Sequence, residues 1–165
     1  MKRWVWLTVS WFGVSGKFKR ARGTWGTLAA LPFAYAIHIT AGNIALAAAG
    51  CALFALGVIA SKEYEKSTGR QDPGEIVIDE VAAIFMLLAF LAPNWQCYLA
   101  AFVVFRIFDV LKPWPVSLAD RKIKGGLGVM VDDVLAALYP VLLMVALYHL
   151  APNWAYRILS WLHWP

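Results

Sequence analysis

The chain has 165 residues, of which 61% are hydrophobic and only 15% are charged. Soluble domains typically contain about 45–50% apolar and about 25% charged residues, so this composition excludes an ordinary soluble domain and indicates a membrane protein. The net charge is +5, but the basic residues are scattered between apolar runs, which argues against a nucleic-acid-binding protein. No linker divides the sequence, so we expect a single domain over residues 1–165.

The sequence begins with MKRWVWLTVSWFGVSG, in which charged residues precede a short, Trp-rich apolar run. This run lacks a clear small-x-small cleavage site, which favours a retained segment over a signal peptide. Trp4, Leu7 and Trp11 share one face of a helix, and Trp favours the headgroup region of a bilayer. We therefore expect an amino-terminal interfacial helix.

Five apolar segments follow, at residues 24–40, 43–60, 75–91, 95–111 and 129–150. Each has about 16–22 residues, enough to cross the hydrocarbon core of a bilayer with help from flanking residues. The breaks between them contain turn-forming residues: AGN at 41–43, TGRQDPG at 68–74, APN at 92–94 and KPWPV at 112–116. The sequence therefore predicts an all-α integral membrane helical bundle of about five transmembrane helices plus the interfacial helix.

Basic residues are concentrated on one predicted side of the membrane. They precede the first segment (Lys2, Arg3, Lys17, Lys19, Arg20, Arg22), follow the second (Lys62, Lys66, Arg70) and follow the fourth (Lys112, Arg121, Lys122, Lys124). The AGN and APN turns contain no basic residue. By the positive-inside rule, we expect the amino terminus and the two charged loops to lie in the cytoplasm.

Three of these segments carry charged residues at the end that we expect to face the cytoplasm: Asp79 and Glu80 in the third, Arg106 and Asp109 in the fourth, and Asp132 and Asp133 in the fifth. Asp79 and Glu80 are expected about one turn from the start of their helix, as are Asp132 and Asp133. Because the third and fifth segments run outward and the fourth runs inward, all these groups should lie at one depth. Arg106 and Asp109 are three residues apart and can form an ion pair.

Ionisable side chains inside a membrane are costly, at about 2.5–3.5 kcal/mol each near the centre of a helix. A layer with five carboxylates and one arginine therefore needs further positive charge. Oxygen ligands select hard divalent cations such as Mg²⁺, Mn²⁺ or Ca²⁺, and Mg²⁺ commonly binds one or two carboxylates together with water and phosphate oxygens. The pattern predicts a divalent metal site.

Elements compatible with phosphate binding surround this layer. The stretches KGGLGVMVDD and RGTWGTLAALP place glycines before a helix start, where exposed N–H groups favour an anion, although such turns also serve as plain helix caps. Lys112 and Arg121 can bind a phosphate or an anionic lipid, or can simply be topology signals. His38, His149 and His163 are expected on the far side, and no Gly-x-Ser-x-Gly motif is present. Among the kinds of catalysis considered, the sequence therefore favours carboxylate and metal chemistry on a phosphorylated group.

Three stretches closely resemble the phosphatidylglycerophosphatase A family of bacterial inner membranes: RGTWGTLAALP, IVIDEVAAIF and FVVFRIFDVLKPWPVSLADRKIKGGLGVMVDDVLAAL. The resemblance covers Gly23 to about Ala137. The motif positions are Gly23, Thr24, Gly26, Asp79, Glu80, Arg106, Asp109, Lys112, Pro113, Pro115, Asp120, Arg121, Gly125, Gly126, Gly128, Asp132 and Asp133. The chain differs in having Arg22 where the family usually has Pro, Thr27 where it often has Ser, and Ala83 where a Gly is expected nearby.

The resemblance implies a Mg²⁺-dependent phosphatase that removes the terminal phosphate of phosphatidylglycerophosphate at the cytoplasmic face of the inner membrane. The expected catalytic residues are Asp79, Glu80, Arg106, Asp109, Asp132 and Asp133, of which Asp79, Glu80, Asp132 and Asp133 would hold Mg²⁺. The expected substrate-binding residues are Thr24, Lys112, Arg121, Gly126 and Gly128. We expect Asp109 to orient Arg106, and either a water molecule or Asp132 or Asp133 to attack the phosphorus.

Two alternatives remain open. The same metal site could serve another lipid phosphate, such as phosphatidic acid or a prenyl phosphate. A divalent-cation transporter also needs acidic residues within membrane helices, but it would be expected to carry them near the midplane. The expected partners are an anionic phospholipid substrate and membrane lipids, with no nucleic acid.

Overall fold

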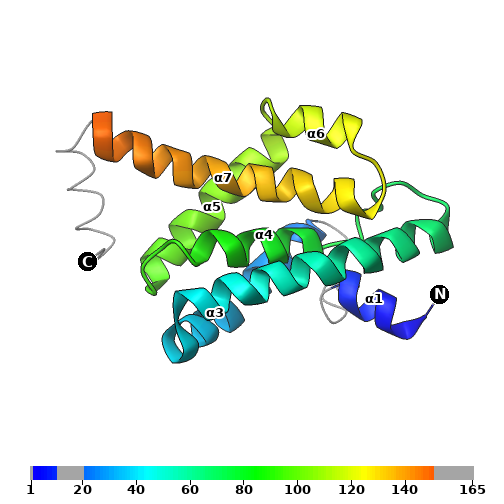
Figure 1. Cartoon of the computed structure of the whole chain (residues 1–165), viewed down its shortest axis with the longest axis horizontal. Coiled ribbons are helices and arrows are strands. Elements are labelled where there is room, and N and C mark those ends of the chain that lie inside the picture. The colour runs from blue at the N-terminus through cyan, green and yellow to red at the C-terminus, as the bar shows by residue number, and fades with distance from the viewer. Residues whose placement is uncertain (1, 11–20, 151–165) are drawn as a thin grey trace.

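The computed structural model describes residues 2–10 and 21–150, and these residues form helices joined by loops, without a β-strand (Figure 1). In chain order the helices are α1 (Arg3–Val9), α3 (Arg22–Thr68), α4 (Ile78–Leu88), α5 (Trp95–Leu111), α6 (Val116–Lys122) and α7 (Gly126–Leu150). The prediction of an all-α fold is confirmed for this part of the chain.

The long helix α3 contains the first two predicted apolar segments and is interrupted at the predicted AGN turn. Gly42 has φ 84° and ψ 175°, a conformation outside the helical region that favours glycine. Gly26 packs against Val77, and Gly57, beyond the interruption, packs against Ile78. Because both positions contact the start of α4, the two halves of α3 form a hairpin, which Figure 1 shows turning back on itself.

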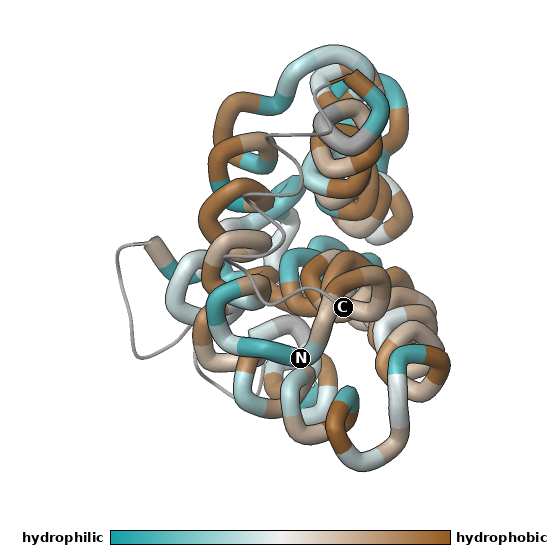
Figure 2. The backbone as a smooth tube through the Cα atoms, turned by 90° about the vertical axis from the view of Figure 1, so that its left-hand side faces the viewer, coloured by the Kyte–Doolittle hydropathy of each residue, from teal (hydrophilic) through white to brown (hydrophobic). Residues whose placement is uncertain are grey.

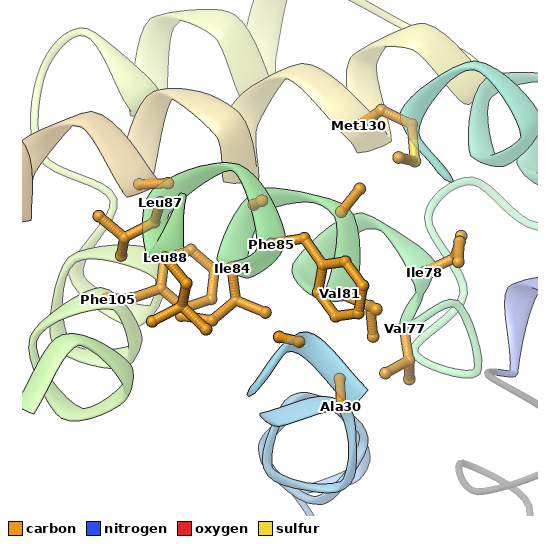
Figure 3. Close-up of a cluster of buried hydrophobic side chains, with 14 of the residues drawn as sticks. Ala30, Val77, Ile78, Val81, Ile84, Phe85, Leu87, Leu88, Phe105 and Met130 are labelled. Atoms are coloured by element: carbon orange, nitrogen blue, oxygen red, sulfur yellow. The ribbon is translucent and has the colours of Figure 1, made fainter. Parts of the chain in front are cut away.

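The short helix α4 lies at the centre of the bundle and packs against both α3 and α7. Nine of its 11 residues are buried, including Val81, Ile84 and Phe85. Figure 3 shows these side chains together with Phe105 of α5 and Met130 of α7. A helix that is apolar on nearly all sides is a core element, and α4 is the element that carries Asp79 and Glu80.

Two helices in the described part of the chain are long and apolar enough to cross a membrane: α3 with 47 residues, and Gly126–Ala146 of α7 with 21. Figure 2 shows hydrophobic residues recurring throughout the coiled backbone of the described part of the chain. By contrast, the 11 residues of α4 rise only about 16 Å, roughly half of the hydrocarbon thickness. The apolar helices indicate a membrane-associated protein, and the count of about five spans stays a prediction.

The amino-terminal helix is present as α1. Its Val5 is buried, and the ring of Trp6 lies 6.0 Å from that of Tyr64 near the end of α3. Trp4 is exposed, whereas Trp11 lies outside the described residues. The helix is thus docked on α3, and its place at the membrane interface stays a prediction.

The helix α6 was not predicted, because the KPWPV stretch was interpreted only as a break. Pro113 and Pro115 do end α5 at Leu111. The chain then forms one more short helix, for which Pro115 is the N-cap, with Arg121 and Lys122 in the last turn. This helix packs against α7.

Candidate active site

A cavity of about 440 Å³ lies between the start of α3, the loop before α4, the start of α4, the end of α5 and the amino-terminal part of α7. Its charged lining residues are the carboxylates Asp72, Asp79, Glu80, Asp109, Asp132 and Asp133 and the cations Arg22 and Lys112. The five carboxylates that the sequence predicted at one depth therefore meet in one cavity. Four of them, all except Glu80, are at most 9% exposed.

The helix starts differ from those predicted, and this changes the position of each acidic pair. Residues 75–77 precede α4, so Asp79 and Glu80 lie in its first turn and not one turn inside. The helix α7 already begins at Gly126, directly after Gly125 with its positive φ of 74°, so Asp132 and Asp133 lie nearly two turns in. Asp79 does not cap α4 by a side-chain bond; its Oδ1 accepts the N–H of Glu80 at 2.9 Å.

Glu80 is fixed by groups from two other helices. The Oγ1 of Thr27 in α3 donates to Glu80 Oε2 at 2.6 Å, and Arg106 in α5 forms an ion pair with the same oxygen. Arg106 Nη1 also lies 2.6 Å from Asp109 Oδ2, which confirms the predicted pair. This network joins α3, α4 and α5, and both carboxylates contact the same nitrogen, Nη1, of the Arg106 guanidinium.

Lys112 connects the other half of the cavity. It ends α5 in the left-handed conformation, with φ 42° and ψ 57°. Its Nζ lies 2.6 Å from Asp132 Oδ2 in α7 and 2.7 Å from Asp120 Oδ1 in α6. The hydrogen bond from Lys112 lowers the pKa of Asp120 below its ordinary value. This pair is therefore ionised at neutral pH.

The cavity contains carboxylate oxygens without partners. Asp132 Oδ1 and Asp133 Oδ2 are buried and have no hydrogen-bond partner among the residues that the structure describes. Within residues 21–150, no basic side chain forms an ion pair with Asp79 or Asp133. Buried carboxylates are costly unless they are paired or bind a metal, so these oxygens fit a hard cation. The described side chains form no ready group of three metal ligands, but Mg²⁺ often takes only one or two carboxylates.

Several predicted substrate-binding residues lie elsewhere. Thr24 and Arg121 do not line the cavity, and Arg121 is exposed. Gly126 instead allows α7 to approach α3, because a Cβ there would lie 2.2 Å from the carbonyl oxygen of Val58. Gly128 lines a separate, smaller cavity of about 110 Å³. Among these five residues, the structure brings only Lys112 to the carboxylates.

His38 lies away from the site, as predicted. Its Nδ1 is 2.9 Å from the hydroxyl of Tyr98 in the first turn of α5. Asp109 lies 11 residues further along this helix, which corresponds to about 16 Å. His38 therefore cannot serve the carboxylate cavity.

The sequence did not single out Arg22, Thr27 and Asp72 as site residues. Thr27 was noted only as a position where the family often has Ser, and Asp72 was interpreted as part of a turn. Arg22 lines the cavity, and its Nη1 lies 3.0 Å from Glu75 Oε1. Burial raises the pKa of Glu75, but hydrogen bonds from Arg22 and Arg70 outweigh it and leave the pKa below the ordinary value. The only local signal for Arg22 and Thr27 was their place in the glycine-rich stretch at the start of α3.

The comparisons with known proteins agree with this site. A family model described as phosphatidylglycerophosphatase A matches residues 7–148. The chain is 38% identical over 136 residues to a phosphatidylglycerophosphatase A of Haemophilus influenzae, which covers 82% of this chain and 83% of the relative. It is 37% identical over 158 residues to a phosphatidylglycerophosphatase A of Escherichia coli, and this match covers 95% of this chain and 88% of the relative.

A third relative, from Bacteroides thetaiotaomicron, has the provisional name phosphatidylinositol-3-phosphatase and is 38% identical over 137 residues, covering 79% of this chain and 85% of the relative. No solved structure matches the chain. Apolar helices, a carboxylate cavity and these relatives define a membrane-associated lipid phosphatase. More narrowly, the chain belongs to the phosphatidylglycerophosphatase A family.

Proposed function

We propose that this protein hydrolyses the terminal phosphate of phosphatidylglycerophosphate to give phosphatidylglycerol and inorganic phosphate, in a Mg²⁺-dependent reaction at the cytoplasmic face of the bacterial inner membrane. Family membership supports the substrate. One observation supports the chemistry: Asp132 Oδ1 and Asp133 Oδ2 are buried, without a hydrogen-bond partner in the described part of the chain, in a cavity that Lys112 also lines.

One or two of the carboxylates Asp79, Asp132 and Asp133 would hold the metal ion, with Glu80 beside them in the network of Thr27 and Arg106. Mg²⁺ in this position would neutralise phosphate charge and lower the pKa of a bound water molecule. The carboxylates provide oxygen ligands of the kind that Mg²⁺ prefers.

Two cations would bind the phosphate: Lys112, which lines the cavity, and Arg106, which pairs with the lining carboxylates Glu80 and Asp109. An ammonium group has three donors, and Lys112 uses two of them for Asp120 and Asp132, so its third can donate to a phosphate oxygen. Arg106 has five N–H donors and is oriented by Glu80 and Asp109. Its remaining donors would stabilise the negative charge that develops during hydrolysis. Asp109 acts through Arg106 as a positioning residue.

The location of the cavity suits a lipid substrate. It lies at one end of apolar helices, so the acyl chains can stay in the leaflet while the terminal phosphate enters the cavity. Attack on the phosphorus could be carried out by water or by Asp132 or Asp133, and trapping of a phosphoenzyme after rapid acid quench would separate the two routes.

The test is phosphate release by purified protein in detergent with phosphatidylglycerophosphate, with and without Mg²⁺. Asp132→Asn and Asp133→Asn are expected to abolish release and to leave membrane insertion intact. Glu63→Gln is the matched control, because Glu63 is an exposed carboxylate of α3 outside the cavity. Mg²⁺-dependent turnover at the wild-type rate in both Asn variants would contradict the proposal.

A second candidate substrate is another lipid phosphate, which the name of the third relative favours. Presenting phosphatidic acid and phosphatidylinositol 3-phosphate in the same assay distinguishes these substrates by their kcat/KM. A cation transporter would show no phosphate release from any lipid. The position of the acidic layer at one end of the described bundle also does not fit a transport site at the midplane.

A further inference from the structure

The loop before α4 contributes one more carboxylate to the cavity, that of Asp72. The helical aspartates Asp79, Asp132 and Asp133 also line the cavity and are at most 8% exposed. Asp72, by contrast, is an exposed residue, and it also lines the smaller cavity of about 110 Å³ beside Glu65. Asp72 therefore has access both to solvent and to the carboxylate cavity.

The backbone of Asp72 is held from α3. Its N–H donates to Glu65 Oε1 at 2.8 Å. Asp72 has a φ of 42°, in the left-handed region that residues other than glycine seldom adopt. The next residue, Pro73, is buried. Glu65 thus stabilises an unusual conformation that brings Asp72 to the cavity.

The carboxylate of Asp72 makes no hydrogen bond or ion pair with the residues that the structure describes. The charges that act on it most strongly are that of Lys112 and those of three other carboxylates. In the same cavity, Asp132 Oδ1 and Asp133 Oδ2 are buried without a partner in the described part of the chain. Carboxylates that share a site repel one another unless a cation lies among them.

A hard divalent cation in this cavity would have a protein side and a solvent side. Mg²⁺ binds one or two carboxylates and keeps several water molecules, because it loses water reluctantly. The buried aspartates of α4 and α7 provide the protein side. Asp72 is the exposed aspartate of the cavity lining, so it fits the solvent side, where the retained water molecules would lie.

We propose that Asp72 is a further residue that binds the divalent metal ion, on the solvent side of the cavity. Glu65 is a positioning residue in this arrangement, since it holds the backbone N–H of Asp72. The inference rests on the proposed function only for the presence of a divalent ion in the cavity.

The test measures binding of Mn²⁺, as a probe for the Mg²⁺ site, to purified protein in detergent without substrate, from the loss of the electron paramagnetic resonance signal of free Mn²⁺. Asp72→Asn keeps the size of the side chain and removes its charge. We expect the Kd for Mn²⁺ to rise by roughly tenfold to a hundredfold, as is typical when a residue that supports a metal site is replaced.

A pair of variants at Glu65 tests the positioning. Glu65→Gln keeps an oxygen that accepts the Asp72 N–H and should change Kd little, whereas Glu65→Ala removes the acceptor and should raise Kd toward the value of Asp72→Asn. Glu63→Gln is the matched control, because Glu63 is an exposed carboxylate of α3 that lines neither cavity. It should leave Kd unchanged.

Phosphate release gives a second readout. The Mg²⁺ concentration for half-maximal release should rise in Asp72→Asn by the same factor as the Kd for Mn²⁺, and saturating Mg²⁺ should restore most of kcat. A purely structural role would lower kcat at saturating Mg²⁺ and leave Kd unchanged.

An unchanged Kd in folded Asp72→Asn would overturn the role of Asp72 and leave the proposed function standing. If Asp72→Asn does not fold, equal Kd values for Glu65→Ala and Glu65→Gln would overturn it. Phosphate release by a wild type that binds no Mn²⁺ would also overturn the inference alone. A wild type that binds Mn²⁺ but releases no phosphate from phosphatidylglycerophosphate would overturn the proposed function, and one that does neither would overturn both.

Discussion

The contact between Gly23 and Glu80 offers a sharp test of how the cavity is built. An added Cβ at Gly23 would lie 1.6 Å from Glu80 Oε1 and 2.4 Å from its Cδ. Gly23 lies in the first turn of α3 and has no positive φ, so space is the obstacle and not backbone conformation. Since the clashing atoms are the far end of a flexible side chain, Gly23→Ala should displace the Glu80 carboxylate and keep the fold.

The magnitude follows from the bonds that Glu80 makes. Its Oε2 accepts from Thr27 at 2.6 Å and pairs with Arg106. A hydrogen bond to a charged group contributes about 1.5–3 kcal/mol, so losing one of these contacts should lower the free energy of unfolding by that amount. Arg106 would also lose one of its two orienting carboxylates, and a displacement of about 1 Å at a catalytic group reduces the rate by about a hundredfold.

Gly74→Ala is the matched control, because Gly74 lines the same cavity but an added Cβ there meets no atom within 4 Å. The measurements are thermal unfolding in detergent, followed by Trp fluorescence, and phosphate release. A double-mutant cycle with Thr27→Val should be non-additive, since both changes remove the same hydrogen bond. If Gly23→Ala matched Gly74→Ala in both stability and activity, this account of the contact would be refuted.

Two further predictions concern Lys112. Lys112→Met removes a donor for the phosphate and leaves Asp132 without its ion pair, so phosphate release should fall by about a hundredfold. Lys124→Met, at an exposed lysine that does not line the carboxylate cavity, should not change it. Asp120→Asn tests the pH dependence of stability. Lys112 lowers the pKa of Asp120, so the ion pair contributes its full stabilisation above the ordinary pKa of aspartate. This contribution is lost as the pH falls through the lowered pKa of Asp120. The stability of the wild type should therefore fall more than that of Asp120→Asn between about pH 5 and pH 3, measured by thermal unfolding.

Features specified by nearby residues could be predicted from the sequence. The TGRQDPG break ends α3 at Thr68, followed by Gly69 with φ 68°. The APN break supplies Asn94, whose side chain accepts the N–H of Cys97 at 2.8 Å and so caps α5. Glycine, proline and asparagine act over only a few residues, and this explains why these boundaries were visible. The ion pair of Arg106 and Asp109 was predictable for the same reason, since it lies within one helical turn.

Features that depend on packing could not be predicted from the same patterns. Thr27 and Glu80 are 53 positions apart, and their contact requires α3 to approach α4 closely at Gly23 and Gly26. The apolar run from residue 75 also did not reveal that α4 begins only at Ile78. A fully buried helix has no polar face from which its start can be read in the sequence. The position of Asp79 and Glu80 within α4 is therefore set by packing against the neighbouring helices.

Ion pairs also connect the helices that surround the cavity. Arg106 ties α5 to α4, and Lys112 ties it to α6 and α7. These two cations engage four acids, and within residues 21–150 Asp79 and Asp133 form no ion pair. A phosphate that enters adds negative charge beside these two carboxylates, and like charges at close range repel unless a cation separates them. In the proposed reaction, the metal ion and the phosphate would therefore each increase the affinity of the cavity for the other, since binding effects of this kind are reciprocal.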